Sequence, residues 1–114
     1  MSKNKIVLVP FPFDDLTSTK VRPAVCLTNP IGQYSHVVLA FITSRISESP
    51  LPTDLIINSA EIDFAQTGLR VSSTLQLHRL ITVSTSLLTR ELGELSSAMQ
   101  KEANAKLKTL FELK

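Results

Sequence analysis

The chain has 114 residues, of which 43% are hydrophobic and 19% charged, with a formal net charge of +2. This length can bury one core but not two, so we expect a single domain over residues 1–114, and the composition excludes a disordered chain. The small net charge excludes the strong positive electrostatic field of a duplex-DNA binder, so any nucleic-acid site must depend on a local group of basic residues.

The first part of the chain predicts three strands. Residues 5–11 are rich in β-branched side chains, which suit a pleated sheet better than a helix. Two prolines follow that lack backbone donors, so this strand should end there and a polar loop over residues 14–20 should follow. Residues 23–29 and 36–43 are further apolar runs, and the Asn-Pro and Gly signals between them predict a hairpin.

The middle of the chain predicts shorter and less regular strands. Residues 54–57 form a short strand after an extended loop that contains two prolines. Residues 71–83 alternate poorly but are rich in aliphatic side chains, which predicts one bent strand or two short ones. Residues 88–92 alternate leucine with polar residues, which favours a final strand over a helix.

From Ser96 onward the pattern changes to that of an amphipathic helix. Ser96 or Ser97 can cap this helix, and Ser97 with Gln100 has the spacing of a reciprocal capping box. We expect most of the apolar face to pack on the chain's own sheet, with some of it available to a partner chain. Its apolar residues are Met99, Ala103, Leu107, Leu110 and Phe111.

Five or six short strands followed by one helix predict a small, mostly antiparallel barrel. The chain has too few helices for the crossover units of a parallel sheet. Cys26 is the single cysteine, so it forms no internal disulfide, and we expect it to be a buried, inert thiol. No apolar stretch approaches the roughly 20 residues needed to cross a bilayer, so we expect no membrane segment and a cytoplasmic location.

The sequence lacks the usual spacing signals of metal, nucleotide and serine-hydrolase sites. One cysteine and two distant histidines, without an HExxH pattern, do not indicate zinc. None of the three glycines belongs to a phosphate-binding loop, and no serine lies in a GxSxG elbow. We therefore expect no metal and no cofactor. Loop carboxylates that meet around magnesium stay an alternative: Asp14, Asp15, Asp54 and Asp63.

Short segments in a fixed order form a more specific pattern. The main ones are VPFPF at 9–13, VRPAV at 21–25 and FITSR at 41–45. They are followed by PTD at 52–54, GL at 68–69, LHRL at 77–80 and LGELS at 92–96. In order and spacing, over nearly the whole chain, these segments resemble the MazF/PemK toxins of bacterial and archaeal toxin–antitoxin pairs. One departure is Asn4-Lys5, where the family commonly has Gly-Asp before the first strand.

The resemblance implies a fold, an activity and partners. The implied fold is mainly β with a C-terminal α-helix, a small SH3-like antiparallel barrel of the MazF/PemK/CcdB type. Family members cut single-stranded RNA, usually mRNA, at short sequences and without a metal. The chain is therefore expected to be a sequence-selective endoribonuclease toxin. Its expected partners are single-stranded RNA, a second copy in a homodimer, and a cognate antitoxin whose flexible segment occupies the RNA groove.

The family's catalytic pair corresponds here to Arg22 and Thr43. In the family, the 2′-hydroxyl attacks the adjacent phosphate and leaves a cyclic phosphate and a 5′-hydroxyl. This reaction needs in-line positioning and stabilisation of charge on the phosphorane oxygens. A guanidinium stays charged and grips phosphate oxygens, and a threonine hydroxyl can hydrogen-bond a phosphate oxygen or the 2′-hydroxyl. No residue stands out as the proton acceptor.

Further residues are candidate RNA contacts because they lie in the polar loop, follow Thr43, or can exchange a proton near neutral pH. These are Thr17, Ser18, Thr19, Lys20, Ser44, Arg45 and His78. Each has an ordinary alternative: a solvated turn for the loop, an ion pair with a surface carboxylate for Arg45, and simple packing for His78. Phe11, Phe13 and Phe41 can stack on bases, although Phe41 is expected in the core.

Two other functions stay open at this stage. One is a non-catalytic barrel that binds RNA or a peptide without cutting. The other is a metal-dependent nuclease that uses Asp14, Asp15 or Asp63.

Overall fold

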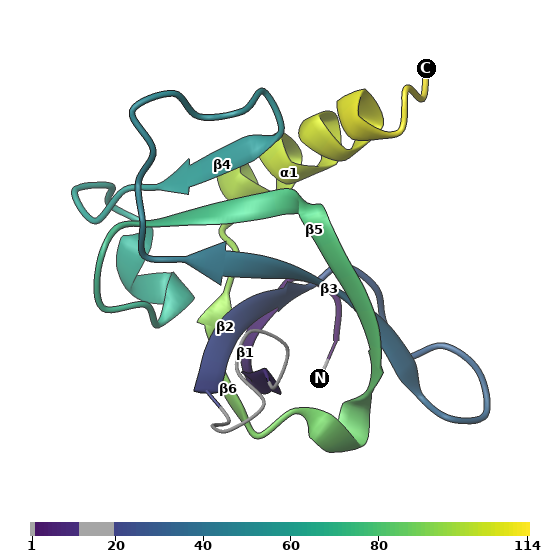
Figure 1. Cartoon of the computed structure of the whole chain (residues 1–114). Coiled ribbons are helices and arrows are strands. Elements are labelled where there is room, and N and C mark those ends of the chain that lie inside the picture. Colours follow the sequence, from purple (N-terminus) through teal and green to yellow (C-terminus); the bar gives the residue numbers. More distant parts are fainter. Residues whose placement is uncertain (1, 12–19) are drawn as a thin grey trace.

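The computed structural model describes residues 2–11 and 20–114. In this part of the chain, six strands form one antiparallel sheet in the order β4-β5-β3-β2-β1-β6. They are β1 Lys5–Phe11, β2 Lys20–Cys26, β3 His36–Thr43, β4 Asp54–Ile57, β5 Ser73–Ser84 and β6 Arg90–Glu94. The sheet curls into a half-barrel, and the C-terminal helix α1, Ser97–Leu110, lies beside it (Figure 1). Two short 3-10 turns, η1 Phe64–Thr67 and η2 Thr85–Leu87, flank β5.

This architecture confirms the predicted fold, a mainly β barrel-like sheet with a C-terminal helix. The bounds of β1, β3 and β4 are those predicted, and the irregular run at 71–83 forms one strand, β5. The second strand differs, because β2 begins at Lys20 rather than at residue 23. Its first residues pair with β1 through Phe11↔Lys20 and Val9↔Arg22, so the Arg22-Pro23 step lies inside a strand and not at its entrance.

β5 is bent by a register slip in its middle. On one side of the slip Ala40 of β3 pairs with Leu80, and on the other side Phe41 pairs with Gln76. Residues 77–79 therefore lie between two paired segments, as in a β-bulge, and the long strand changes direction there (Figure 1). The first part of β5 pairs with β4 on one side and β3 on the other, and the second part pairs with β3. The sheet can curl around this bend.

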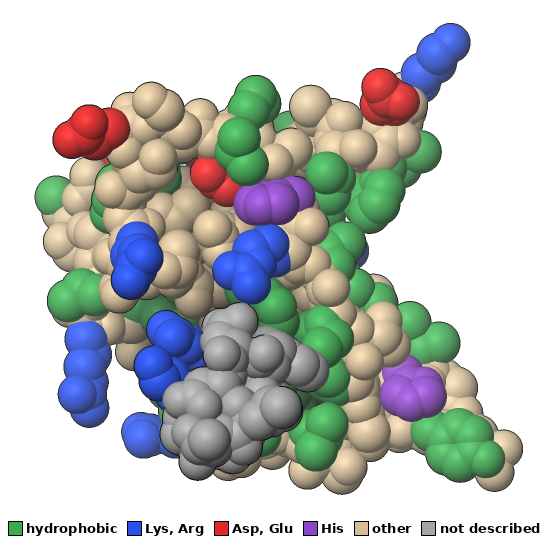
Figure 2. All heavy atoms as spheres, viewed as in Figure 1, with side chains coloured by type: hydrophobic (Ala, Val, Ile, Leu, Met, Phe, Trp, Pro, Cys, Tyr) green, Lys and Arg blue, Asp and Glu red, His purple; other side chains and the backbone are tan. Residues whose placement is uncertain are grey.

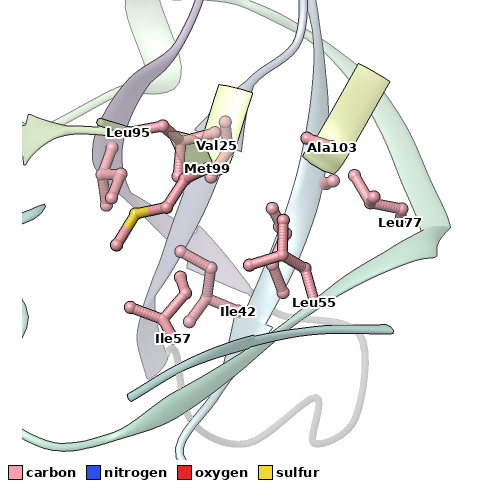
Figure 3. Packing of buried hydrophobic residues seen from close by; sticks show 11 residues of the cluster. Val25, Ile42, Leu55, Ile57, Leu77, Leu95, Met99 and Ala103 are labelled. Atoms are coloured by element: carbon pink, nitrogen blue, oxygen red, sulfur yellow. The ribbon is translucent and has the colours of Figure 1, made fainter. Parts of the chain in front are cut away.

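Two hydrophobic clusters lie on the two faces of the sheet, because successive strand residues point to opposite faces. One cluster includes Val25, Ile42 and Leu55, and α1 covers it with Met99 and Ala103 (Figure 3). The other cluster contains the alternate residues of the same strands: Val7, Val9, Ala24, Cys26, Val37, Leu39 and Val83. Cys26 is fully buried, as predicted, and burial raises the pKa of its thiol.

The helix packs on the sheet only over its first turns. Met99 and Ala103 are buried and Leu107 is partly buried against the cluster. Phe111, which was predicted to share this apolar face, is the residue that ends the helix and is 55% exposed. The helix runs past the edge of the sheet there, so its last turn has no strand beneath it (Figure 1). No helix among the described residues is long and apolar enough to span a membrane.

Ser96, rather than Ser97, caps α1. Ser96 has the extended backbone that the cap position requires, and its Oγ accepts a hydrogen bond from the Met99 N–H at 3.2 Å. The predicted capping box of Ser97 with Gln100 is wrong, because the Gln100 side chain donates to the Leu95 carbonyl instead.

The two serines provide a matched test of this cap. Ser96→Ala is expected to lower the free energy of unfolding by about 1 kcal/mol, because the Met99 N–H loses its acceptor. Ser97→Ala, at an exposed helical position, should change it by less than about 0.5 kcal/mol. Urea denaturation of both variants measures the difference, and equal losses would contradict the cap.

Candidate functional site

An open pocket of about 660 Å³ lies on the face of the sheet opposite to α1. Along the strands, the residues that line the pocket alternate with residues of the cluster that α1 covers. Gln76, for example, lines the pocket, and its neighbours Leu75 and Leu77 belong to that cluster. The pocket is lined by Arg22, residues 41–47, Asp54, Thr74, Gln76 and Arg79.

The pocket opens where β2 parts from β3. The pairing of these strands ends at Ala24↔Phe41, although β2 continues along β1 as far as Lys20. Pro23 is the next residue of β2, and it has no backbone N–H to donate to a ladder. Continuing the register by two residues places Arg22 opposite Thr43. Both predicted catalytic residues line the pocket, so the structure brings them together.

β5 and β4 extend the same face with polar side chains. Thr43 pairs with Thr74 and Phe41 pairs with Gln76 across β3 and β5. Gln76 in turn pairs with Asp54 of β4. Since cross-strand partners share a face, these side chains form two neighbouring rows along the pocket.

The bend in β5 adds a third basic side chain to the pocket. Arg79 lies in the slipped segment, and its guanidinium carbon is 5.5 Å from the centroid of the Phe41 ring. This distance suits a cation–π interaction. Phe41 was expected in the core, but it is only half-buried: it packs against the cluster around Leu39 and also lines the pocket.

Hydrogen bonds tie the Thr43 segment to β5. The Thr43 Oγ1 accepts a hydrogen bond from the Arg45 N–H at 3.2 Å, and the Thr74 hydroxyl donates to the Arg45 carbonyl at 3.0 Å. A hydroxyl that accepts one hydrogen bond still has its own hydrogen to donate. Thr43 is therefore oriented by its neighbours and can donate to a ligand in the pocket.

The charge of the pocket is mainly positive. In the described part of the chain, its lining includes three arginines, Arg22, Arg45 and Arg79, and one carboxylate, Asp54. Among the described residues, none of these arginines lies within 4.0 Å of a carboxylate, so the proposed surface pair of Arg45 is not seen there. Figure 2 shows Lys and Arg side chains gathered on this face, with an acidic side chain and a histidine at the edge of the group. The arginines are available to an anion such as a phosphate.

Asp54 and Gln76 each bury an oxygen that lacks a hydrogen-bond partner among the described residues. These atoms are Asp54 Oδ1 and Gln76 Oε1. The other carboxylate oxygen of Asp54 accepts from the Leu51 N–H at 3.0 Å, and the Asp54 side chain is only 7% exposed. His78 Nδ1 lies 3.9 Å from Oδ1, which is close enough for an electrostatic interaction but too long for a hydrogen bond.

The structure places some of the predicted RNA contacts in the pocket and others beside it. Ser44 and Arg45 line the pocket with Thr43. His78 does not line it but contacts Asp54, and Lys20 is exposed at the start of β2. The predicted contacts Thr17, Ser18 and Thr19 lie outside the described residues.

Sequence reasoning missed Gln76 and Arg79 as site residues and considered Asp54 only as a magnesium ligand. Gln76 and Asp54 meet through cross-strand register, and Arg79 reaches the pocket through the slip in β5; no local pattern encodes either feature. Asp63 does not line the pocket and instead precedes η1, while Asp14 and Asp15 lie outside the described residues. In the described part of the chain, no three His, Cys, Asp or Glu side chains gather as metal ligands.

Comparisons with solved structures place this fold among toxins. The Mycobacterium tuberculosis toxin MazF-mt6 is 20% identical, with a TM-score of 0.74 over 96% of this chain and 98% of that one. A MazE-MazF structure (Form-II) from Deinococcus radiodurans is 18% identical, with a TM-score of 0.76 over 100% and 97% of the two chains. An endoribonuclease in complex with its cognate antitoxin, from Mycobacterial species, is 16% identical, with a TM-score of 0.75 over 100% and 97%. At these identities the likeness establishes the fold.

Sequence comparison establishes the family. A search of curated proteins found no match. The model of the family described as PemK-like, MazF-like toxin of type II toxin-antitoxin system matches residues 2–111. Because this match spans almost the whole chain and includes the strands that build the pocket, the protein belongs to the PemK-like, MazF-like toxins of type II toxin–antitoxin systems.

Proposed function

We propose that this toxin is a sequence-selective, metal-independent endoribonuclease that cuts single-stranded RNA in the pocket around Arg22 and Thr43. The observation that carries the proposal is that both side chains line one positively charged pocket in a member of this family. The solved relatives support it, since one is an endoribonuclease bound to its cognate antitoxin.

The proposed reaction is attack of a ribose 2′-oxygen on the adjacent phosphorus. The new P–O2′ bond forms as the P–O5′ bond breaks, which leaves a 2′,3′-cyclic phosphate and a 5′-hydroxyl. The proton of the 2′-hydroxyl goes to an acceptor, and the departing 5′-oxygen takes up a proton. The nucleophile belongs to the RNA, so no metal is needed to generate a hydroxide ion.

Arg22 and Thr43 suit the electrostatic part of this reaction. The Arg22 guanidinium is exposed at the pocket, where it can donate two hydrogen bonds to non-bridging oxygens as their charge grows. Thr43 can donate its hydroxyl hydrogen to a phosphate oxygen while Arg45 N–H holds its oxygen in place. Arg45 and Arg79 are positioned to hold neighbouring phosphates of the strand.

The proposed partners follow from the same site and from the family. A cognate antitoxin with a flexible acidic segment would compete with RNA for the arginines of the pocket. We further propose that the toxin acts as a homodimer in the cytoplasm. Apolar side chains at the end of α1, such as Phe111 and Leu113, are exposed and available to a partner chain.

Cleavage of defined RNA tests the proposed function. The purified toxin should cut long single-stranded RNAs at a restricted set of sites in the presence of excess EDTA. The downstream products should accept a kinase label without prior phosphatase treatment, because they carry a 5′-hydroxyl. RNA that binds but stays intact would support a non-catalytic module instead, and restoration of cutting by magnesium would support a metal-dependent nuclease.

Thr43 can be tested separately by removing only its hydroxyl. Thr43→Val keeps a β-branched shape and is expected to lower kcat/KM for RNA cleavage by about tenfold to a hundredfold, because one oriented donor to the transition state is lost. Thr43→Ser retains that donor and should stay within about fivefold of wild type. If the Val variant were as active as wild type, the Thr43 hydroxyl would have no part in the reaction.

A further inference from the structure

Thr74 is a buried polar residue beside Thr43, its cross-strand partner. It belongs to β5, is only 3% exposed, and lines the pocket. Its hydroxyl donates to the Arg45 carbonyl at 3.0 Å, across 29 residues of the chain. A threonine hydroxyl has a single hydrogen to donate. That of Thr74 is used inside the protein, so Thr74 itself offers no donor to a ligand.

The Arg45 backbone lies just beyond the end of a strand. β3 ends at Thr43, and its pairing with β5 ends at Thr43↔Thr74, after which the chain turns away toward β4 (Figure 1). Strand pairing therefore no longer fixes the exposed residue Arg45. The hydrogen bond from Thr74 attaches its backbone to β5, which is anchored in the core by Leu75 and Leu77.

Arg45 in turn orients Thr43. Its N–H donates to Thr43 Oγ1 at 3.2 Å. This bond occupies one lone pair of the oxygen and favours one staggered position of the side chain, from which the hydroxyl hydrogen can point into the pocket. The carbonyl and the N–H of one residue thus connect the two threonines, and a shift of Arg45 would release Thr43 to rotate.

Resting on the proposed ribonuclease function, we propose that Thr74 is a positioning residue for the reaction. Through the Arg45 backbone, it keeps the Thr43 hydroxyl directed at the phosphate that is cut. Its contribution belongs to the transition state, because an oriented donor acts on charge that develops there and a small displacement of that donor is costly. A buried hydroxyl with a structural role alone would contribute to stability and leave kcat unchanged.

Thr74→Val tests this role, because it removes the hydroxyl and keeps the β-branched shape. It is expected to lower kcat for RNA cleavage by about threefold to tenfold and to leave KM within about twofold, since the Thr43 hydroxyl is misdirected but still present. Thr74→Ser keeps the donor and should stay within about twofold of wild type in kcat. The measurement is steady-state cleavage of an RNA with one cut site, at a temperature where circular dichroism shows every variant folded. Thr74→Ala also lacks the hydroxyl and replaces the Val variant if that variant does not fold.

Ser73 provides a matched control on the same strand. It is also 3% exposed, and its hydroxyl donates to the Val71 carbonyl at 2.9 Å. Unlike Thr74, it does not line the pocket. Ser73→Ala therefore loses a comparable buried hydrogen bond and should lower the melting temperature, with kcat within about twofold of wild type. If it lowered kcat as much as Thr74→Val does, the loss would reflect stability and the inference would be wrong.

A double-mutant cycle identifies the residue through which Thr74 acts. In a Thr43→Val background, Thr74→Val should cause no further loss of kcat, because no hydroxyl is left to orient. In an Arg22→Lys background, it should keep its full effect, because the lysine change leaves Thr43 and Arg45 in place. A full effect in the Thr43→Val background would mean that Thr74 acts by another route, and it would overturn the inference.

The outcomes separate this inference from the function beneath it. If Thr43→Val is impaired and folded Thr74→Val is as active as wild type, Thr74 has no positioning role and the ribonuclease function stands. If Thr43→Val is as active as wild type, the inference fails with the role of Thr43. A wild type that leaves every RNA intact overturns the proposed function itself.

Discussion

Arg22→Ala is expected to lower kcat/KM for RNA cleavage by about a hundredfold or more, the largest effect on activity of any single change. The reason is electrostatic: the guanidinium can donate two hydrogen bonds to phosphorane oxygens, and oriented donors of this kind are typically worth about 10²–10³ in rate. Arg22 is exposed, so its removal should leave the melting temperature within about 2 °C of wild type. A fluorogenic RNA assay and a thermal melt measure the two quantities.

Two comparisons sharpen the Arg22 experiment. Arg22→Lys keeps the charge but loses the paired donors, so it should recover only part of the activity. Lys101→Ala removes the same charge from an exposed position of α1, on the other side of the sheet, and should cut as wild type does. If Arg22→Ala and Lys101→Ala behaved alike, Arg22 would have no role in the chemistry.

Gly68→Ala is expected to cause the largest loss of stability, about 2–4 kcal/mol in the free energy of unfolding. Gly68 ends η1 with φ of +72°, where a side chain is strained. A Cβ there would also overlap the backbone carbonyl of Leu92 in β6. Gly93, the next residue of β6, is packed as closely against the backbone of Gln66 and Thr67, so η1 and β6 meet backbone to backbone.

Gly32→Ala is the matched control for Gly68. Gly32 has nearly the same backbone conformation, with φ of +75°, but nothing lies within 4 Å of the position of its Cβ. This variant carries the conformational strain alone and should lose about 1 kcal/mol. Urea denaturation gives the free energy of unfolding of both variants. The difference between their losses is the cost of the overlap with Leu92, apart from the cost of the backbone strain. A loss at Gly68 no larger than the loss at Gly32 would show that β6 can move away from η1.

The candidate site could be predicted only in part. Arg22 and Thr43 were identified because each lies in a short segment typical of the family. Gln76 lies in none of these segments, and Arg79 lies in LHRL at 77–80 without a predicted role. Gln76 reaches the pocket through its pairing with Phe41, and Arg79 through the slip in the pairing of β3 with β5. Asp54 was considered only as a metal ligand, since nothing local indicates that its carboxylate is buried beside Gln76.

Local patterns in the sequence determined the elements of this protein. A β-branched run predicted the bounds of β1, an apolar run predicted those of β3, and a three- and four-residue apolar repeat predicted α1, because each pattern reflects the geometry of a single element. The tertiary structure decided the start of β2 at Lys20, the bend in β5 and the parting of β2 from β3 at Ala24. These features depend on pairing between segments far apart in the chain, where the free energy comes from register and shared burial rather than from local conformational preference.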